Sequence, residues 1–171
     1  MKSLPSKPSL YRIEGGELSL SGKALLELMA AVLAKGCDFR FQARGWSMTP
    51  FIHDGDILCV SPFREKHPGV GEVVAYIQPA CEKLVVHRLV RRQENDWLIL
   101  GDNTPEETVE RIPSVNLIGR VTRIERDGKK VWLGLGPERY LIALFSRTGI
   151  LLPVLSRIRQ VYKEWMQRQP E

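Results

Sequence analysis

Residues 38–60 read DFRFQARGWSMTPFIHDGDILCV, in which two short β-rich runs flank a loop of turn-forming residues. The runs FRFQARG and DILCV contain the aromatic and branched side chains that strands favour, whereas the loop supplies Gly, Pro and Asp. Ser47 stands in that loop, beside Trp46 and shortly before Pro50, which restricts the backbone that precedes it. The stretch therefore predicts two strands joined by a tightly specified loop that carries a serine hydroxyl.

The same texture continues to residue 133, in the runs GEVVAYI, KLVVHRLVRR, DWLILGD and NLIGRVTRIERDGKKVWL. Several of these runs alternate apolar and polar residues, and RDGKK is a hairpin turn signal of the Asp-Gly type. Six or seven short strands with few helices predict a mainly β fold, a compact antiparallel domain that is bent or partly closed.

Helical patterns flank this β region on both sides. Apolar residues recur at helical spacing over residues 22–35, with serines before them and Gly36 after them. Beyond Gly136, Pro137 suits a first helical position and Gly149 a helix end, and a second apolar stripe follows. We expect residues 1–36 to form a flexible lead-in and one amphipathic helix, residues 37–135 the β domain, and residues 136–171 a basic helical hairpin.

Length and composition set the class of protein. A chain of 171 residues with 43% hydrophobic and 26% charged residues is long enough for one sizeable core with an appendage. The three cysteines are widely spaced and include no C-x-x-C pair, so they indicate neither a disulfide framework nor a zinc site, and no cofactor is expected. The N-terminal residues contain no apolar run of signal-peptide or membrane-span length, which predicts a cytoplasmic protein.

Positive charge is concentrated at the C-terminal end. Residues 123–171 contain 10 Lys and Arg against 5 Asp and Glu, whereas residues 1–122 are balanced. The apolar stripes here are compatible with packing on the β domain, with peripheral contact to an anionic membrane, or with binding of an acidic peptide. Arg147, Gly149 and Pro153 interrupt the run YLIALFSRTGILLPVL, which argues against an ordinary transmembrane helix.

Three residue types in the β region could support nucleophilic catalysis. Ser47 needs a base within hydrogen-bond reach, because a hydroxyl alone is inert near neutral pH. His53 and His67 fall in polar loops, whereas His87 lies inside a strand-like run, where it is either a satisfied core residue or a base. Asp102 follows a strand and a glycine, where an aspartate either caps the turn or orients a histidine.

Five ordered blocks then carry a resemblance to a known family: GWSMTPFIHDGDILCV, GEVVAY, LVVHRLVRR, LILGDNT and NLIGRV. In this order and at these spacings, the sequence resembles the signal peptidase and LexA-type repressor superfamily of serine peptidases. The resemblance covers about residues 45–121, and it implies a β-rich peptidase domain of the signal peptidase/LexA type.

The resemblance also implies roles for individual residues. The serine of the S-M-x-P block, Ser47, is the implied nucleophile. The implied base is His87, because the endoplasmic-reticulum and archaeal branch has histidine where other members have lysine. The G-D-N block of that branch supplies an acidic partner, which corresponds to Asp102. The sequence departs from the branch after this block, where GDNTPEETVE leaves open whether Glu106 or Glu107 assists Asp102.

For two other residues in or beside these blocks, the evidence for a function is weaker. Asp56 follows Gly55 and is expected to be a structural turn residue. Lys83 is the lysine nearest to the predicted base strand and is kept as an alternative base.

The resulting hypothesis is a serine endopeptidase that removes a leader or signal-like segment from a precursor protein by Ser/His/Asp catalysis, in the cytoplasm and with peripheral membrane contact through the basic helices. The membrane anchor usual in the histidine branch is not seen in residues 1–44. The alternatives are a LexA-like self-cleaving regulator and an inactive peptide-binding module of the same fold. Nucleic acid is not expected as a partner, since residues 1–36 contain one helix where a helix-turn-helix reader needs two.

Overall fold

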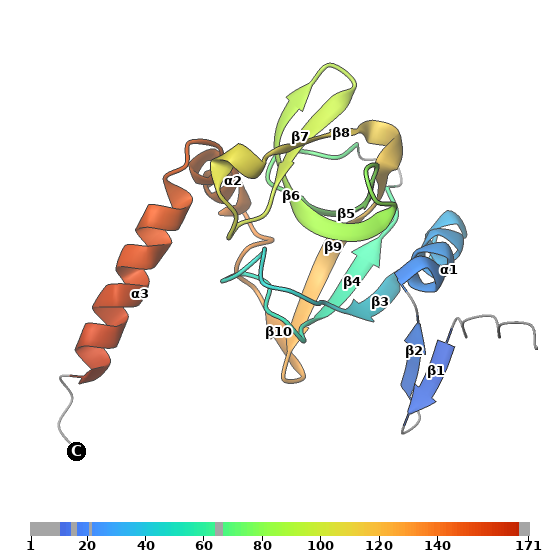
Figure 1. Ribbon diagram of the computed structural model, residues 1–171, viewed down its shortest axis with the longest axis horizontal. Helices are drawn as coiled ribbons and strands as arrows, with labels where there is room; N and C mark the ends of the chain where they lie inside the picture. The colour runs from blue at the N-terminus through green and yellow to red at the C-terminus, as the bar shows by residue number, and fades with distance from the viewer. Residues whose placement is uncertain (1–10, 15–16, 21, 64–66, 168–171) are drawn as a thin grey trace, which may run out of the picture.

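The computed structural model describes residues 11–14, 17–20, 22–63 and 67–167 (Figure 1). One large sheet dominates, with strand order β3-β4-β9-β5-β6-β7-β8 and with β10 paired to β9. Every pair of neighbouring strands in this sheet is antiparallel. The strands are β3 (Phe39–Gln42), β4 (Ile57–Ser61), β5 (Val73–Gln78), β6 (Lys83–Gln93), β7 (Asp96–Leu100), β8 (Glu110–Pro113), β9 (Leu117–Arg126) and β10 (Lys129–Val131).

The sheet curls into a half-barrel, as Figure 1 shows for the long strand β6. Three irregularities in register, between Cys59 and Val60, between Ala75 and Tyr76, and near Leu89, accompany this curvature. Such bulges bend a strand and increase its local twist. The predicted mainly β, partly closed antiparallel domain is therefore confirmed.

Two apolar clusters lie on opposite faces of the curled sheet. One contains Leu58, Val73 and Ile124, together with Met29 and Leu33 from the first helix. The other contains residues of β5, β6, β7 and β8, namely Val74, Tyr76, Leu89, Trp97, Ile99 and Ile112, together with Leu117. Successive residues of a strand point to opposite faces, so β5 sends Val73 to the first cluster and Val74 to the second.

The helix α1 (Gly22–Ala34) confirms the prediction for residues 22–35 within one residue. It buries Met29 and Leu33 against the sheet, and Gly36 follows it with a positive φ of 76°. The Asp-Gly turn signal is also confirmed, since β9 and β10 pair across Asp127 and Gly128, both with positive φ.

The lead-in is more ordered than the sequence predicted. Strands β1 (Tyr11–Glu14) and β2 (Glu17–Leu20) pair antiparallel, whereas the residues before the first helix were expected to form a flexible lead-in. Apolar residues alternate along both segments of the sequence, a pattern that supports strand pairing. Residues 1–10 lie outside the described part of the chain.

Two helices occupy the place of the predicted helical hairpin, α2 (Arg139–Arg147) and α3 (Leu151–Gln167), and they are separated at Gly149, whose φ is +67°. The chain bends by 111° between them, so they are not the antiparallel pair of a hairpin. Ile142 and Leu151 pack against Phe51 of the β domain. Within the described ranges, no single helix has the length and apolar character of a membrane span, but α2 and residues 151–158 pass that test together across a bend of 111°. Figure 1 shows α3 extending away from the sheet.

Candidate active site

The loop that carries Ser47 is held by the segment that follows β7. The backbone N–H of Asn103 donates to the carbonyl of Ser47 at 2.7 Å, and its side-chain amide donates to the carbonyl of Trp46 at 3.2 Å. Gly101 permits this approach, because a Cβ at that position would lie 2.7 Å from the Ser47 carbonyl oxygen. The G-D-N block therefore positions the serine loop through hydrogen bonds to the backbone of that loop.

His87 lies at the centre of β6, opposite Val74 of β5. Its Nε2 atom is 3.0 Å from Ser47 Oγ, which is hydrogen-bond distance, and its Nδ1 atom is 3.2 Å from the hydroxyl of Tyr76. Burial lowers the pKa of His87 below its ordinary value, while the Glu110 and Asp102 carboxylates act in the opposite direction. The imidazole is thus kept neutral to lower pH than usual, the state in which it can accept a proton.

Three residues behind His87 were not predicted from the sequence. The hydroxyl of Tyr76 donates to Glu110 Oε1 at 3.2 Å, and the amide of Gln78 donates to Glu110 Oε2 at 2.8 Å. Tyr76 and Gln78 lie on β5 and Glu110 begins β8, so two strands supply the residues behind the imidazole. In the sequence, Tyr76 stands two residues after Val74, the residue that pairs with His87. Recognising Tyr76 as a partner of His87 requires the strand register, which the sequence does not give.

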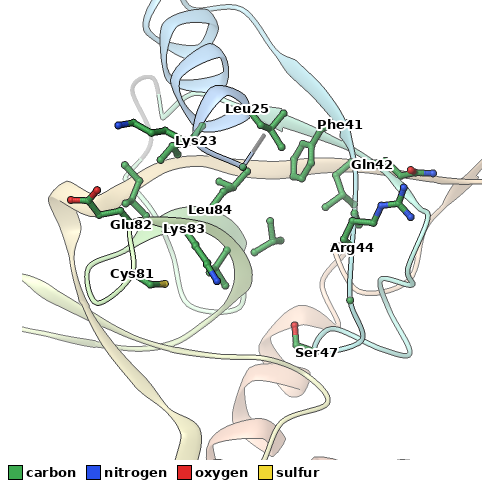
Figure 2. Close-up of a pocket in the computed structure, with 18 of the residues that line it drawn as sticks. Lys23, Leu25, Phe41, Gln42, Arg44, Ser47, Cys81, Glu82, Lys83 and Leu84 are labelled. Atoms are coloured by element: carbon green, nitrogen blue, oxygen red, sulfur yellow. The ribbon is translucent and has the colours of Figure 1, made fainter. Parts of the chain in front are cut away.

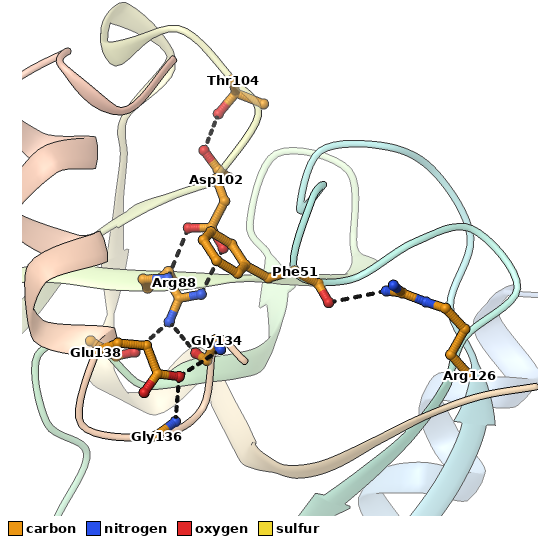
Figure 3. Close-up of polar contacts among 10 residues, drawn as sticks. Phe51, Arg88, Asp102, Thr104, Arg126, Gly134, Gly136 and Glu138 are labelled. Carbon is orange, nitrogen blue, oxygen red and sulfur yellow. Dashed lines mark hydrogen bonds and ion pairs between the residues drawn. The ribbon is translucent and has the colours of Figure 1, made fainter. Parts of the chain in front are cut away.

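Asp102 does not occupy the predicted position beside the imidazole. Both of its carboxylate oxygens accept hydrogen bonds from Arg88, at 2.8 and 2.7 Å, and neither side chain of the pair is exposed to solvent. Arg88 also donates to the carbonyls of Gly71 and Gly134, as Figure 3 shows for Gly134. The reason is strand geometry: Arg88 and His87 are adjacent on β6, so their side chains point to opposite faces of the sheet.

The other acidic residues considered in the sequence, Glu106, Glu107 and Asp56, lie in the loops around the site. Glu106 and Glu107 are exposed in the short helix η1 (Glu106–Thr108). Asp56 is buried and accepts two hydrogen bonds from Arg126, at 2.9 and 2.8 Å, and one from the backbone N–H of His53. Burial alone would raise the pKa of Asp56, but these hydrogen bonds hold it below the ordinary value. This arrangement agrees with the structural role expected for Asp56, in the loop that follows Ser47.

Lys83, the alternative base, is exposed at the beginning of β6. It lies four residues before His87, and the nitrogen bonded to Ser47 Oγ belongs to the histidine. The geometry therefore favours His87 over Lys83 as the partner of the serine.

A cavity of about 900 Å³ opens beside Ser47 (Figure 2). Its walls come from α1, β3 and the first half of β6, and they are mainly apolar, with Leu25, Phe41, Leu84 and Val86 among the lining residues. Figure 2 shows Ser47 at one end of this space, across from Leu25 of α1. Cavities of this size accommodate several side chains of a peptide or a compact organic molecule.

The edges of two strands border the same cavity. Among the described strands, β3 is the terminal strand of the sheet, and β7 pairs with β6 only from Arg88 onward. Residues 83–87 of β6 therefore have backbone groups on one edge that no described strand uses. Free edges of this kind can pair with an extended peptide.

The arrangement has the elements of a nucleophile with a base. A serine hydroxyl lies at hydrogen-bond distance from a neutral imidazole, whose other nitrogen is held by a polar partner. Within the described ranges there is no group of three or more His, Cys, Asp or Glu side chains that could hold a metal ion.

The chain was compared with curated proteins and with models of protein families. A search of curated proteins found no match. A family model described as Peptidase S24-like matches residues 10–122, which is well over half of the chain and includes both Ser47 and His87. Membership supports a serine peptidase or a self-cleaving fold of the LexA type. From the curled antiparallel sheet, the serine loop and this match, we conclude that the chain belongs to the Peptidase S24-like family.

Proposed function

We propose that this protein is a serine endopeptidase in which Ser47 is the nucleophile and His87 the general base. The observation that carries the proposal is the 3.0 Å separation between Ser47 Oγ and His87 Nε2, at the end of an apolar cavity. An activated serine requires a base at this distance, and the fold brings the two together from positions 40 residues apart.

The reaction follows the chemistry of acyl transfer. His87 Nε2 removes the proton of Ser47 as Oγ attacks the peptide carbonyl, and the imidazolium then gives that proton to the leaving amine. Water then attacks the acyl-serine ester while His87 takes its proton, and the imidazolium returns that proton to Ser47 Oγ as the ester bond breaks and the acid product leaves. Among the described residues, the backbone N–H groups of Ser47 and Met48 have no acceptor, so they are the donors we assign to the oxyanion.

We propose an extended segment of a precursor protein, such as a leader or signal-like peptide, as the substrate. Its backbone would pair with the free edge of β6 beside His87, and apolar side chains next to the scissile bond would enter the cavity between α1 and β3. The histidine at position 87 supports assignment to the histidine-base branch of the signal peptidase superfamily. Members of the superfamily outside that branch have lysine as the base.

Acylation of the serine tests the mechanism. A p-nitrophenyl ester of a short apolar peptide should acylate the wild-type protein, with release of p-nitrophenol and a mass increase that maps to Ser47. His87→Ala should slow this step about 100-fold or more. Ser61→Ala, which removes a serine hydroxyl bonded to Thr122 elsewhere in the sheet, is the matched control and should react like wild type. Equal labelling of the wild type and His87→Ala would refute the role of the base.

Intact mass separates processing of other proteins from self-cleavage. A peptidase that acts on precursors should keep its full mass during incubation and should cleave an added peptide. A loss of mass that Ser47→Ala abolishes would instead assign the chain to the self-cleaving, LexA-like class.

We also propose that α2 and α3 contact an anionic membrane surface. Both helices expose apolar side chains at helical spacing, Leu141, Leu144 and Phe145 on α2, and Val154, Ile158 and Val161 on α3. Arg147 and Arg157 are exposed on the same two helices. Apolar and basic side chains together favour binding at the interface of a bilayer with anionic headgroups.

A further inference from the structure

We propose that Tyr76 and Glu110 are positioning residues that set the tautomer of His87, through a continuous chain of hydrogen bonds from Ser47 to Gln78. The inference rests on the proposed role of His87 and adds two residues that neither the sequence motifs nor the family match assigns. The chain runs from Ser47 to His87, from His87 to Tyr76, from Tyr76 to Glu110, and from Gln78 to Glu110.

The direction of each hydrogen bond follows from the last acceptor. Glu110, as a carboxylate, has no proton to donate, so it can only accept from Tyr76 and from Gln78. The single hydroxyl proton of Tyr76 is therefore directed at Glu110, and the phenol oxygen is left as an acceptor toward His87. A neutral imidazole that faces an acceptor at Nδ1 has its proton on Nδ1, which leaves Nε2 free to accept the Ser47 proton.

Burial keeps the phenol in the state that this chain needs. Tyr76 is completely buried. Burial, and then the neighbouring Glu110 carboxylate, raise the pKa of Tyr76 well above its ordinary value, so the hydroxyl keeps its proton throughout the range in which a histidine titrates. The phenol therefore acts as a neutral spacer that connects the imidazole to the carboxylate.

The carboxylate also stabilises the charge that forms during the reaction. When Nε2 takes the serine proton, the ring becomes an imidazolium, and its Nδ1 proton stays in place on the hydrogen bond to Tyr76. The charged groups that act on the ring are Glu110 from β8 and Asp102 from the loop after β7, and both favour the imidazolium. Asp102 is already neutralised by Arg88 on the other face of β6, so the unpaired negative charge toward His87 comes from Glu110. Glu110 thus performs the electrostatic function that the family resemblance implied for Asp102.

The tautomer can be measured without any turnover. In protein with ¹⁵N-labelled histidine, long-range ¹H–¹⁵N correlations distinguish protonated from unprotonated ring nitrogens, and loss of signals in His87→Gln assigns those of His87. The wild type should show Nδ1 protonated and Nε2 unprotonated at neutral pH. Tyr76→Phe, which removes only the hydroxyl, should shift the ring toward the Nε2–H form. Protonated Nε2 in the wild type, or an unchanged tautomer in Tyr76→Phe, would overturn the proposal.

The pH profile of Ser47 acylation provides a second readout that a merely structural role would not move. Glu110→Gln removes a charge that raises the pKa of His87, so the acid limb of the acylation rate should move to lower pH. Tyr76→Phe should move it in the same direction, and both variants should acylate about 10- to 100-fold more slowly at the plateau. An acid limb that stays in place in Glu110→Gln would refute the electrostatic part of the proposal.

Matched controls exclude general effects of losing a phenol or a carboxylate. Tyr140→Phe removes an exposed hydroxyl of α2 that is bonded to Arg139, and Glu125→Gln removes a carboxylate of β9 that is bonded to Arg40 and Arg123. Both controls should keep the wild-type tautomer and pH profile. A protein with no acylation but with the predicted Nδ1–H tautomer would contradict the peptidase proposal alone, whereas an active protein with the opposite tautomer would contradict the positioning proposal alone.

Discussion

Arg88 and Asp102 form a two-bond ion pair with no solvent exposure, one residue away from His87 on the opposite face of β6. The guanidinium also binds the carbonyls of Gly71 and Gly134 and lies 5.5 Å from the ring centroid of Phe51. Glu138 lies near the same pair and accepts hydrogen bonds from the backbone N–H groups of Gly134 and Gly136 (Figure 3). The pair therefore connects β6 to the segment after β7 that holds the Ser47 loop, and it lies beside the residues that precede α2.

Asp102→Asn should lower the free energy of unfolding by about 3–5 kcal/mol, because it leaves the buried Arg88 without its counter-charge. Urea unfolding at neutral pH measures this loss. In the double variant Arg88→Met/Asp102→Leu, much of the stability should return, since neither charge is then buried. If Asp102→Asn kept its stability and lost only activity, Asp102 would have the catalytic role that the family resemblance implied.

Gly101→Ala should slow acylation of Ser47 by about 100-fold, because the new Cβ would collide with the Ser47 carbonyl oxygen and displace the serine loop. The same collision should cost about 1–3 kcal/mol of stability. Gly69→Ala is the control, since a Cβ there meets no atom within 4 Å. An unchanged acylation rate in Gly101→Ala would show that the loop tolerates the displacement.

Stability should rise with pH through the range in which His87 titrates. Burial lowers the pKa of His87, so between that lowered pKa and the ordinary value of about 6.5 the unfolded chain binds more protons than the folded one. The stability that depends on neutral His87 is fully present above pH 6.5 and is lost as pH falls through the folded-state pKa of His87. Unfolding free energies measured from pH 5 to 7 should have a steeper slope in wild type than in His87→Gln, by at most about 1.4 kcal/mol per pH unit. Equal slopes would mean that His87 is not held neutral.

Through α2 and α3, the protein should bind vesicles that contain anionic lipid and leave neutral vesicles unbound. Replacing Leu141, Phe145 and Ile158 by serine removes exposed apolar surface and should reduce co-flotation at least tenfold. Val115→Ser changes a 90% exposed valine on the short helix η2 (Ser114–Asn116) and is the control. Flotation that is unaffected by the triple substitution would exclude this surface as the membrane contact.

Much of the fold could be predicted because it depends on local patterns. Alternation and turn residues predicted the antiparallel strands, helical spacing predicted α1, and Pro137 and Gly149 predicted the two C-terminal helices. The prediction of a flexible lead-in was wrong for residues 11–14 and 17–20, which pair as β1 and β2. In the sequence, the alternating runs YRIE and ELSL flank a Gly-Gly pair, which is a hairpin signal that the interpretation as a flexible lead-in did not use.

The amino-acid sequence by itself determined that Ser47 sits in a rigid loop and that His87 lies within a strand of a curled β domain, since both depend on residues close by in the chain. Only the tertiary structure decided which carboxylate serves the imidazole. His87 faces Tyr76 and Glu110 because β5 and β6 pair Val74 with His87. Arg88, one residue later, points to the other face of the sheet and forms an ion pair with Asp102. A shift of one residue in that register would exchange the two faces, and no motif in the linear sequence records it.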